Sequence, residues 1–192
     1  MGDNTDLSEL TPDQGFEIFG TNPYDHLGTS VSALGDINGD AIDDIIVGAH
    51  RAESENGYED SGQSYVIFGQ SGRNDFKNEF DVSELDGSNG FAINGRVFSG
   101  SSGAAVNSAG DINGDGIDDI VIGAPLAENT SSDRDAGQAY IVFGKDQTKG
   151  DTFSESVELS ALDGYNGFLL DGASAGDQAG YEVSGAGDLN GD

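Results

Sequence analysis

The sequence predicts an all-β protein, a β-propeller fragment of about two and a half four-stranded antiparallel blades. Glycine is abundant, with 31 of 192 residues, whereas proline is rare, with 3. Apolar residues form short runs rich in β-branched side chains and show no long helical period, which is typical of short strands joined by tight turns. The third observation is an internal repeat, which distinguishes between the possible all-β folds.

One hexapeptide occurs three times in the chain. It reads Gly-Asp-Ile-Asn-Gly-Asp, with Leu in place of Ile in the last copy, and the copies begin at Gly35, Gly110 and Gly187. The repeat length is therefore 75 residues and then 77. The two extra residues fall within the segment 144–167, where we expect a surface loop to tolerate them at little cost.

Each repeat contains four predicted strands. The second of them is apolar at consecutive positions, so we expect it to be buried on both faces. Four antiparallel strands per repeat form a propeller blade. A solenoid is the alternative, but solenoid repeats are usually shorter and mostly parallel. The predicted strands are 28–34, 44–49, 64–68 and 90–94, with further strands of the fourth type at 15–19 and 167–170.

We expect all the repeats to belong to one propeller-type domain. A propeller generally has about 4 to 8 blades, which together cover both faces of each sheet. We therefore expect either a longer parent chain or a homo-oligomer that forms through the open blade faces. The predicted divisions are 1–34 (a partial blade with a fourth-type and a first strand), 35–109 (repeat 1), 110–186 (repeat 2) and 187–192 (a truncated third loop).

The repeated hexapeptide opens an aspartate-rich loop suited to calcium, which takes about 6–8 oxygen ligands. Positions one, three, five and nine supply side-chain oxygens, and position seven supplies a main-chain carbonyl. Glycine at position six permits a sharp turn, but Ala41 stands there in the first copy, and we expect some strain. The predicted metal ligands are Asp36, Asn38, Asp40, Ile42 and Asp44 in the first loop, Asp111, Asn113, Asp115, Ile117 and Asp119 in the second, and Asp188, Asn190 and Asp192 in the third.

Two other interpretations of these loops are a helix-flanked calcium loop of the EF-hand or dockerin type and an Asx turn without a metal. An EF-hand needs a glutamate at position twelve, but Val47 and Ile122 stand there within apolar runs, so the EF-hand and dockerin interpretations fail. Asx turns, in which Asp and Asn bond their own main chain, are the alternative to a metal. Repetition favours a metal, as does the repulsion among three carboxylates that a cation would relieve. The third loop is incomplete, so we expect it to be empty or weak.

The chain carries a formal net charge of −29, from 36 acidic and 7 basic side chains. This charge argues against nucleic acid and anionic membrane surfaces as partners, because phosphate groups would be repelled. No apolar run approaches the ~20 residues that span a bilayer, so we expect no membrane insertion. The alternative explanation of the charge is an acidic surface of the kind that salt-tolerant organisms use. Without cysteine there is no disulfide framework.

Several motifs resemble the FG-GAP repeat of integrin α-subunits, in the long form found in many bacterial surface proteins. The resemblance implies a propeller stiffened by calcium-binding blades, with partner-binding loops on another face. The motifs are Phe68-Gly69, Phe143-Gly144, Gly123-Ala124-Pro125, its variant Gly48-Ala49-His50, and the Leu-Asp-Gly-x-Asn-Gly-Phe segments 85–91 and 162–168.

The predicted function is that of a calcium-binding, non-catalytic adhesion or recognition module of a larger secreted or cell-surface protein. Extracellular calcium sites commonly have Kd values of ~10⁻⁴–10⁻³ M, so millimolar calcium outside a cell would occupy them. The expected ligand is a protein or glycan, and the variable loops 51–63 and 126–138 are candidate contacts unless they are merely solvated. The alternatives are the propeller part of a carbohydrate-active enzyme with structural calcium, and a structural spacer.

No catalytic residue is predicted. His26 and His50 stand at inequivalent repeat positions without a Ser-His-Asp arrangement, and we expect both to be solvent-exposed. A motif that recurs in every blade is more naturally structural, since an active site is usually unique.

Overall fold

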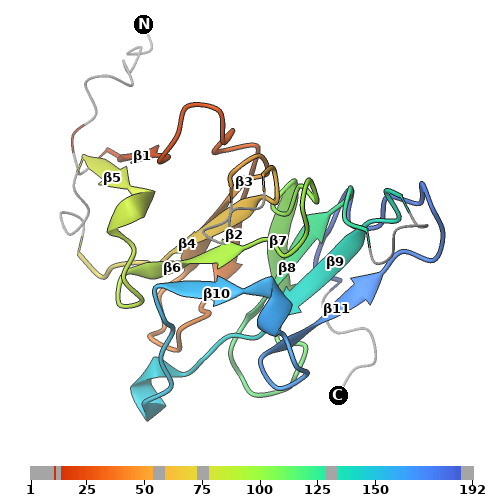
Figure 1. The fold of residues 1–192 in the computed structure, drawn as a ribbon. Coiled ribbons are helices and arrows are strands. Elements are labelled where there is room, and N and C mark those ends of the chain that lie inside the picture. Colours follow the sequence, from red (N-terminus) through yellow and green to blue (C-terminus); the bar gives the residue numbers. More distant parts are fainter. Residues whose placement is uncertain (1–10, 12–13, 54–58, 73–77, 129–133, 187–192) are drawn as a thin grey trace, which may run out of the picture.

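The computed structural model describes residues 11, 14–53, 59–72, 78–128 and 134–186. These residues form short strands and single-turn 3₁₀ helices, and no α-helix occurs among them. Two sheets lie side by side, each with four antiparallel strands, and the first gains a fifth, parallel strand at its edge (Figure 1). The predicted all-β class and the partial propeller are therefore confirmed.

The four predicted strands of each blade are present, in the antiparallel order first to fourth. The second strands, β3 and β8, are almost wholly buried, as their continuous apolar sequence predicts. Blade I consists of β2 (Ser30–Gly35), β3 (Asp44–Ala49), β4 (Gln63–Ile67) and β6 (Gly90–Asn94). Blade II consists of β7 (Ala105–Gly110), β8 (Asp119–Ala124), β9 (Gln138–Val142) and β11 (Gly167–Asp171).

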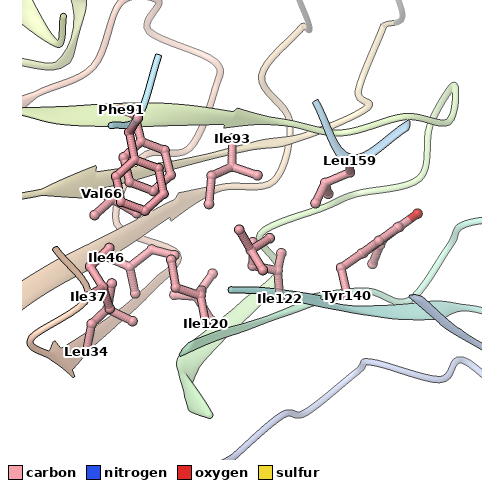
Figure 2. Close-up of a cluster of buried hydrophobic side chains, with 14 of the residues drawn as sticks. Leu34, Ile37, Ile46, Val66, Phe91, Ile93, Ile120, Ile122, Tyr140 and Leu159 are labelled. Atoms are coloured by element: carbon pink, nitrogen blue, oxygen red, sulfur yellow. The ribbon is translucent and has the colours of Figure 1, made fainter. Parts of the chain in front are cut away.

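The main hydrophobic core lies between the two blades, and both contribute to it about equally (Figure 2). Side chains of blade I such as Ile46 and Phe91 face Ile120, Ile122 and Tyr140 of blade II, and all five are almost fully buried. Because burial of apolar area is the dominant stabilising term, neither blade is complete without the other.

The connection between the third and fourth strands is longer than a simple turn and carries an extra strand. In blade II this strand is β10 (Ser156–Glu158), which leaves its own blade and pairs in parallel with β6 of blade I. In blade I it is β5 (Glu79–Asp81), which pairs in parallel with β1 (Glu17–Phe19). The connections also contain the 3₁₀ helices η2 (Val82–Glu84), η3 (Gln147–Lys149) and η4 (Leu159–Ala161).

The two extra residues of repeat 2 lie before β10, within 145–152, where residues 148–152 are exposed, as expected for a surface loop. The segment that follows them, around β10, is part of the core instead. Phe153 and Leu159, which flank β10, are buried in the core between the blades. The ring of Phe153 stacks on Phe91 with a centroid distance of 4.1 Å. The segment is thus a clasp through which blade II holds the outermost strand of blade I.

Glycine in the Gly-Ala-Pro motif, or in its variant at 48–50, marks a close approach between main chains of neighbouring segments. A Cβ added at Gly48 would lie 2.1 Å from the carbonyl oxygen of Gly103, at the start of blade II. At Gly123 it would lie 1.9 Å from the carbonyl oxygen of Gly180, in the chain that follows blade II. No side chain fits at such distances, so the glycine is required by the contact between main chains.

Blade II exposes apolar side chains at positions that blade I buries. Ile112 is 48% exposed, whereas the equivalent Ile37 is 0% exposed, and Leu170 is 54% exposed, whereas Ile93 is 0% exposed. The far side of blade II thus presents the surface that blade I presents to its neighbour. No helix in the described ranges is long and apolar enough to cross a membrane.

Candidate metal centre

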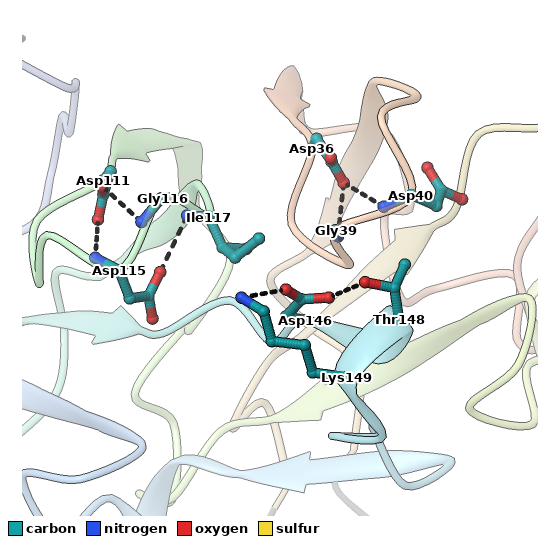
Figure 3. Close-up of polar contacts among 10 residues, drawn as sticks. All are labelled: Asp36, Gly39, Asp40, Asp111, Asp115, Gly116, Ile117, Asp146, Thr148 and Lys149. Atoms are coloured by element: carbon teal, nitrogen blue, oxygen red, sulfur yellow. Dashed lines mark hydrogen bonds and ion pairs between the residues drawn. The ribbon is translucent and has the colours of Figure 1, made fainter.

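The two complete aspartate loops occupy the same place in their blades. One connects β2 to β3, and the other connects β7 to β8. Their first aspartates, Asp36 and Asp111, each turn back into the loop and bond its main chain (Figure 3). The sequence repeat therefore produces a structural repeat at the level of single hydrogen bonds.

The carboxylate at position one organises the turn. Asp36 Oδ1 accepts hydrogen bonds from the N–H groups of Gly39 and Asp40, at 2.7 and 3.1 Å, and Oδ2 accepts one from Ala41 at 2.8 Å. These bonds wrap the main chain around one carboxylate. Asp111 accepts the equivalent bonds from Gly114 at 2.7 Å, Asp115 at 3.0 Å and Gly116 at 2.9 Å.

The side chains at positions three and five also bond the loop. Asn38 Oδ1 accepts from the N–H of Asp40 at 2.9 Å, and Asp40 Oδ1 accepts from the N–H of Ile42 at 2.8 Å. The second loop repeats both bonds, at 2.9 Å each. These are Asx-type bonds. The alternative interpretation, in which the loops are Asx turns without a metal, requires no bonds beyond these.

The aspartate at position nine is fully buried and joins three parts of the blade. Asp44 Oδ2 accepts from the N–H of Ile37 at 3.0 Å, and Oδ1 accepts from the N–H of Gly69 at 2.8 Å. It thereby ties the start of β3 to the loop and to the chain that follows β4. Asp119 is equally buried and accepts from Ile112 at 2.8 Å and from Gly144 at 2.9 Å.

The electrostatics of position nine show that the loop carboxylates interact. Burial raises the pKa of Asp44 to about 7, against the opposing effect of its two main-chain bonds, and the charges of Asp40 and Asp36 raise it further. The pKa of Asp119 is raised in the same way, by burial and by the charge of Asp115. Each loop thus concentrates negative charge that a bound cation would stabilise.

The oxygen atoms of each loop are enough for a hard cation such as calcium only if the neutral amide and carbonyl oxygens are counted with the carboxylates. In the described part of the chain, no three His, Cys, Asp or Glu side chains are grouped so that they alone could hold a metal ion. The amide of Asn38 or Asn113 and the carbonyl of Ile42 or Ile117 would have to complete each site. Carboxylate, amide and carbonyl oxygens are the ligands that calcium takes in proteins.

The glycine of the Phe-Gly motif belongs to this site, which the sequence interpretation missed. A Cβ at Gly69 would lie 2.3 Å from the carbonyl oxygen of Asp43, and a Cβ at Gly144 would lie 2.3 Å from that of Asp118. Only glycine can bring its N–H group this close to the buried aspartate. Its recurrence at a fixed distance after each loop was the available signal.

The first loop is sealed by blade II, whereas the second is exposed. The N–H groups of Lys145 and Gln147 donate to the carbonyl oxygens of Ile37 and Asn38, at 2.9 and 2.8 Å. The N–H of Asp118 donates to the carbonyl oxygen of Asp36 at 3.1 Å. Beside the second loop lies a cavity of about 400 Å³ whose lining includes Asp115, Lys145, Lys149 and Tyr165.

Several predicted positions lie partly or wholly outside this centre. The third loop, with Asp188, Asn190 and Asp192, lies outside the described residues, as do 54–58 and 129–133 of the candidate partner loops. His26 is exposed as expected, but His50 is only partly exposed, and its Nδ1 lies 3.0 Å from Thr29 Oγ1. Burial, followed by the nearby charge of His26, lowers the pKa of His50.

The two sheets, each with the same aspartate loop between its first and second strands, define successive blades of a partial β-propeller. The FG-GAP repeat family matches residues 27–67 and 102–142, which cover the first three strands of each blade and the loop within it. These two stretches are therefore FG-GAP repeats.

Two curated proteins illustrate the relationship. Phosphatidylinositol-glycan-specific phospholipase D of Dictyostelium discoideum is 28% identical over 156 residues, which cover 76% of this chain and 15% of that protein. Integrin alpha-PS2 of Drosophila melanogaster is 30% identical over 132 residues, which cover 67% of this chain and 8% of that protein. The chain thus spans less than a sixth of the length of either relative.

Position six of the loop provides a first prediction. Ala41 has a φ of +67°, and the equivalent Gly116 has a φ of +90°. The left-handed region costs a residue other than glycine about 1–2 kcal/mol, while glycine loses about 0.5–1 kcal/mol more backbone entropy on folding. Ala41→Gly should therefore stabilise the fold by about 0.5–1 kcal/mol.

Gly116→Ala is the matched change and should destabilise by about the same amount, because no heavy atom lies within 4 Å of its added Cβ and only the backbone conformation is penalised. Melting temperatures of both variants in EDTA measure the two effects. A lower melting temperature for Ala41→Gly would show that the positive φ is not strained.

Asp44 provides a second prediction, which concerns calcium-free stability. The folded state keeps this proton up to about pH 7, whereas the unfolded carboxyl releases it near its ordinary pKa of 3.8. Between these values unfolding releases a proton, so the contribution of Asp44 to stability falls by about 1.4 kcal/mol per pH unit as the pH rises. Urea unfolding in EDTA across this window measures the slope. Asp44→Asn cannot titrate, and an equal slope in that variant would contradict the shifted pKa.

Proposed function

We propose that this chain is a calcium-binding, non-catalytic module that serves adhesion or ligand recognition in a larger secreted or cell-surface protein. One observation carries the calcium assignment. Two loops with the same residues at every predicted ligand position, each with its buried aspartate at position nine, make the same hydrogen bonds at the same place in successive blades. Such repetition favours a common structural role.

Calcium would act on the blade contact as well as on the loop. In the first loop, the carbonyl oxygens of Ile37 and of the predicted ligand Asn38 accept hydrogen bonds from the N–H groups that follow β9 in blade II. Holding Asp36, Asn38 and Asp40 around one cation would therefore also fix the acceptors that blade II uses. The ion would supply positive charge where the loop concentrates negative charge, and the predicted ligands of the loop would hold it in place.

The proposed location follows from the calcium affinity that such sites usually have. Extracellular modules bind calcium with Kd values of ~10⁻⁴–10⁻³ M, which suits millimolar calcium outside the cell. The likeness to an integrin α-subunit supports a cell-surface context. The partner would be a protein or a glycan.

Two alternatives remain distinct from this proposal. The likeness to a phosphatidylinositol-glycan-specific phospholipase D favours, as the second function, a propeller that accompanies an enzyme. The other alternative is a spacer that only separates other domains of a longer protein. Repetition of the loop in both blades fits a structural role for calcium in all three cases.

Calorimetric titration of the chelator-treated chain with calcium tests the metal assignment. We expect two sites with Kd values of ~10⁻⁴–10⁻³ M, and Asp40→Asn and Asp115→Asn should each weaken one, because a neutral amide oxygen replaces a carboxylate. An absence of binding heat throughout this range would contradict the assignment.

The recognition function needs a separate experiment. The immobilised chain should capture a ligand from panels of extracellular matrix proteins and glycans in calcium, and release it in EDTA. Capture that requires calcium and is lost in the double variant Asp40→Asn with Asp115→Asn would support the proposal. A chain that binds calcium but captures nothing from either panel would contradict the recognition function and leave the two alternatives, a spacer or a propeller that accompanies an enzyme.

A further inference from the structure

The outermost strand of a blade receives a parallel strand from the next repeat, and this device occurs twice in the same register. Ala92 of β6 is paired with Ser156, and Glu17 of β1 is paired with Glu79. In both cases the amide of the outermost strand donates to the residue just before the arriving strand, at 2.9 Å from Ala92 to Glu155 and at 2.8 Å from Glu17 to Asn78.

Strand β11 is the third outermost strand and corresponds to β6. Within the described residues it pairs with β9 along one side and with no strand along the other. Leu170 is 54% exposed, whereas the equivalent Ile93 beneath the clasp is 0% exposed. Leu169 occupies the position of Ala92, and Phe168 occupies the position of Phe91, on which Phe153 stacks.

One side chain distinguishes the two edges. Asn94, at the end of β6, accepts from Gln63 Nε2 at 2.7 Å and donates through Nδ2 to Glu158 of the arriving strand at 2.6 Å. Asp171 stands at the equivalent position of β11, where its carboxylate accepts from Gln138 Nε2 at 2.6 Å. An ionised carboxylate has no hydrogen to donate, so Asp171 cannot bind a glutamate as Asn94 does.

We propose that the outer edge of β11 is a docking site for a parallel strand of the β10 type, from a further FG-GAP repeat that carries a lysine, an arginine or another hydrogen-bond donor opposite Asp171. The two strands of this kind among the described residues place Asp81 and Glu158 at that position. A second copy of this chain would bring one carboxylate against another. The edge therefore selects a different repeat and disfavours its own copies.

The proposal is independent of calcium binding, and a peptide experiment can test it directly. The probe is a peptide of residues 153–161, which contains β10 with its flanking Phe153 and Leu159, together with the same peptide carrying Glu158→Lys. Each is added to the isotopically labelled full chain, and amide shifts are followed by NMR in calcium and in EDTA. This measurement detects affinities as weak as millimolar.

The Glu158→Lys peptide should bind about tenfold more tightly than the native peptide, because a hydrogen bond between charged groups replaces a repulsion. The shifts should centre on 168–171. In the Asp171→Asn chain the native peptide should gain affinity and the preference for lysine should shrink. Leu170→Asp, on the exposed edge, should weaken both peptides.

Failure of both peptides to perturb 168–171 would overturn the proposal, as would affinities that do not depend on residue 158. Light scattering provides the remaining test. A mass that rises with concentration in the native chain but not in Leu170→Asp would assign the edge to a second copy instead. Because the peptides are titrated with and without calcium, failure of the calcium sites cannot be confused with failure of the edge.

Discussion

Calcium in hundredfold excess over its Kd should raise the melting temperature of this chain by about 5–10 °C for each occupied loop. A ligand that binds only the folded state at this excess contributes about 2.7 kcal/mol, and each kcal/mol shifts the melting temperature of a chain this size by about 2–4 °C. Differential scanning calorimetry in EDTA and in calcium measures the increment.

The loop acids provide matched variants for this experiment. Asp40→Asn and Asp115→Asn remove one exposed carboxylate at position five, and each should reduce the increment of its own loop, because the amide oxygen that remains is a weaker ligand for calcium. Asp43→Asn removes an exposed carboxylate from the first loop at a position that is not a predicted ligand, so it should keep the increment. Each increment is the difference between the melting temperatures of one variant in calcium and in EDTA, so changes in calcium-free stability cancel.

The net charge of −29 calls for a further control, since any divalent cation screens repulsion among surface acids. Magnesium at equal concentration reports this general effect, which all variants should share. Equal increments in the native chain, the two ligand variants and Asp43→Asn would leave the loops as Asx turns and the charge as a feature of the surface.

Gly48→Ala should lower the melting temperature by about 6–12 °C. Its Cβ would lie 2.1 Å from the carbonyl oxygen of Gly103 in the next blade. Forcing extra atoms into a close-packed contact costs about 1–3 kcal/mol, and more when the neighbour is main chain, so we expect about 3 kcal/mol here. Thermal melts measure the loss. Hydrogen exchange should show lower protection of core amides such as those of Phe91 and Val106.

Gly20→Ala is the matched control for this substitution. Its Cβ would meet only side-chain atoms of Leu27, the nearest at 3.2 Å, and a flexible side chain can move. The control should therefore lose little stability. A loss in Gly48→Ala no larger than in Gly20→Ala would show that the blades separate easily and that the Gly-Ala-Pro glycine has another role.

The strands that form the blades were predictable because their signals are local. The apolar run at 44–49 and the aromatic and β-branched run at 64–68 give β3 and β4 to within one residue. The extra strands β5 and β10 were not predicted, because each has three residues and only Phe80 or Val157 marks its apolar face. What makes them strands is their pairing with β1 and β6, which local sequence does not contain.

The candidate site, like the fold, was predictable where its signals are local and was missed where it depends on contacts between distant segments. Regular spacing of oxygen-bearing residues identified both loops, and the positive φ of Ala41 agrees with the predicted strain. The role of Gly69 in reaching Asp44, and the sealing of the first loop by Lys145, depend on contacts between distant segments. Such contacts follow from how the blades pack, and a motif read along one chain does not specify them.

The clasp of β10 on β6 also has a consequence for synthesis on the ribosome. Asn94 and its partner Glu158 are 64 residues apart, so at about 5–20 residues per second the ribosome needs roughly 3–13 s to deliver the strand that completes the edge of blade I. During that interval β6 is a bare sheet edge, able to pair with another nascent chain. The high negative charge of the chain then has a protective effect, since neighbouring nascent copies repel one another until each clasp has closed.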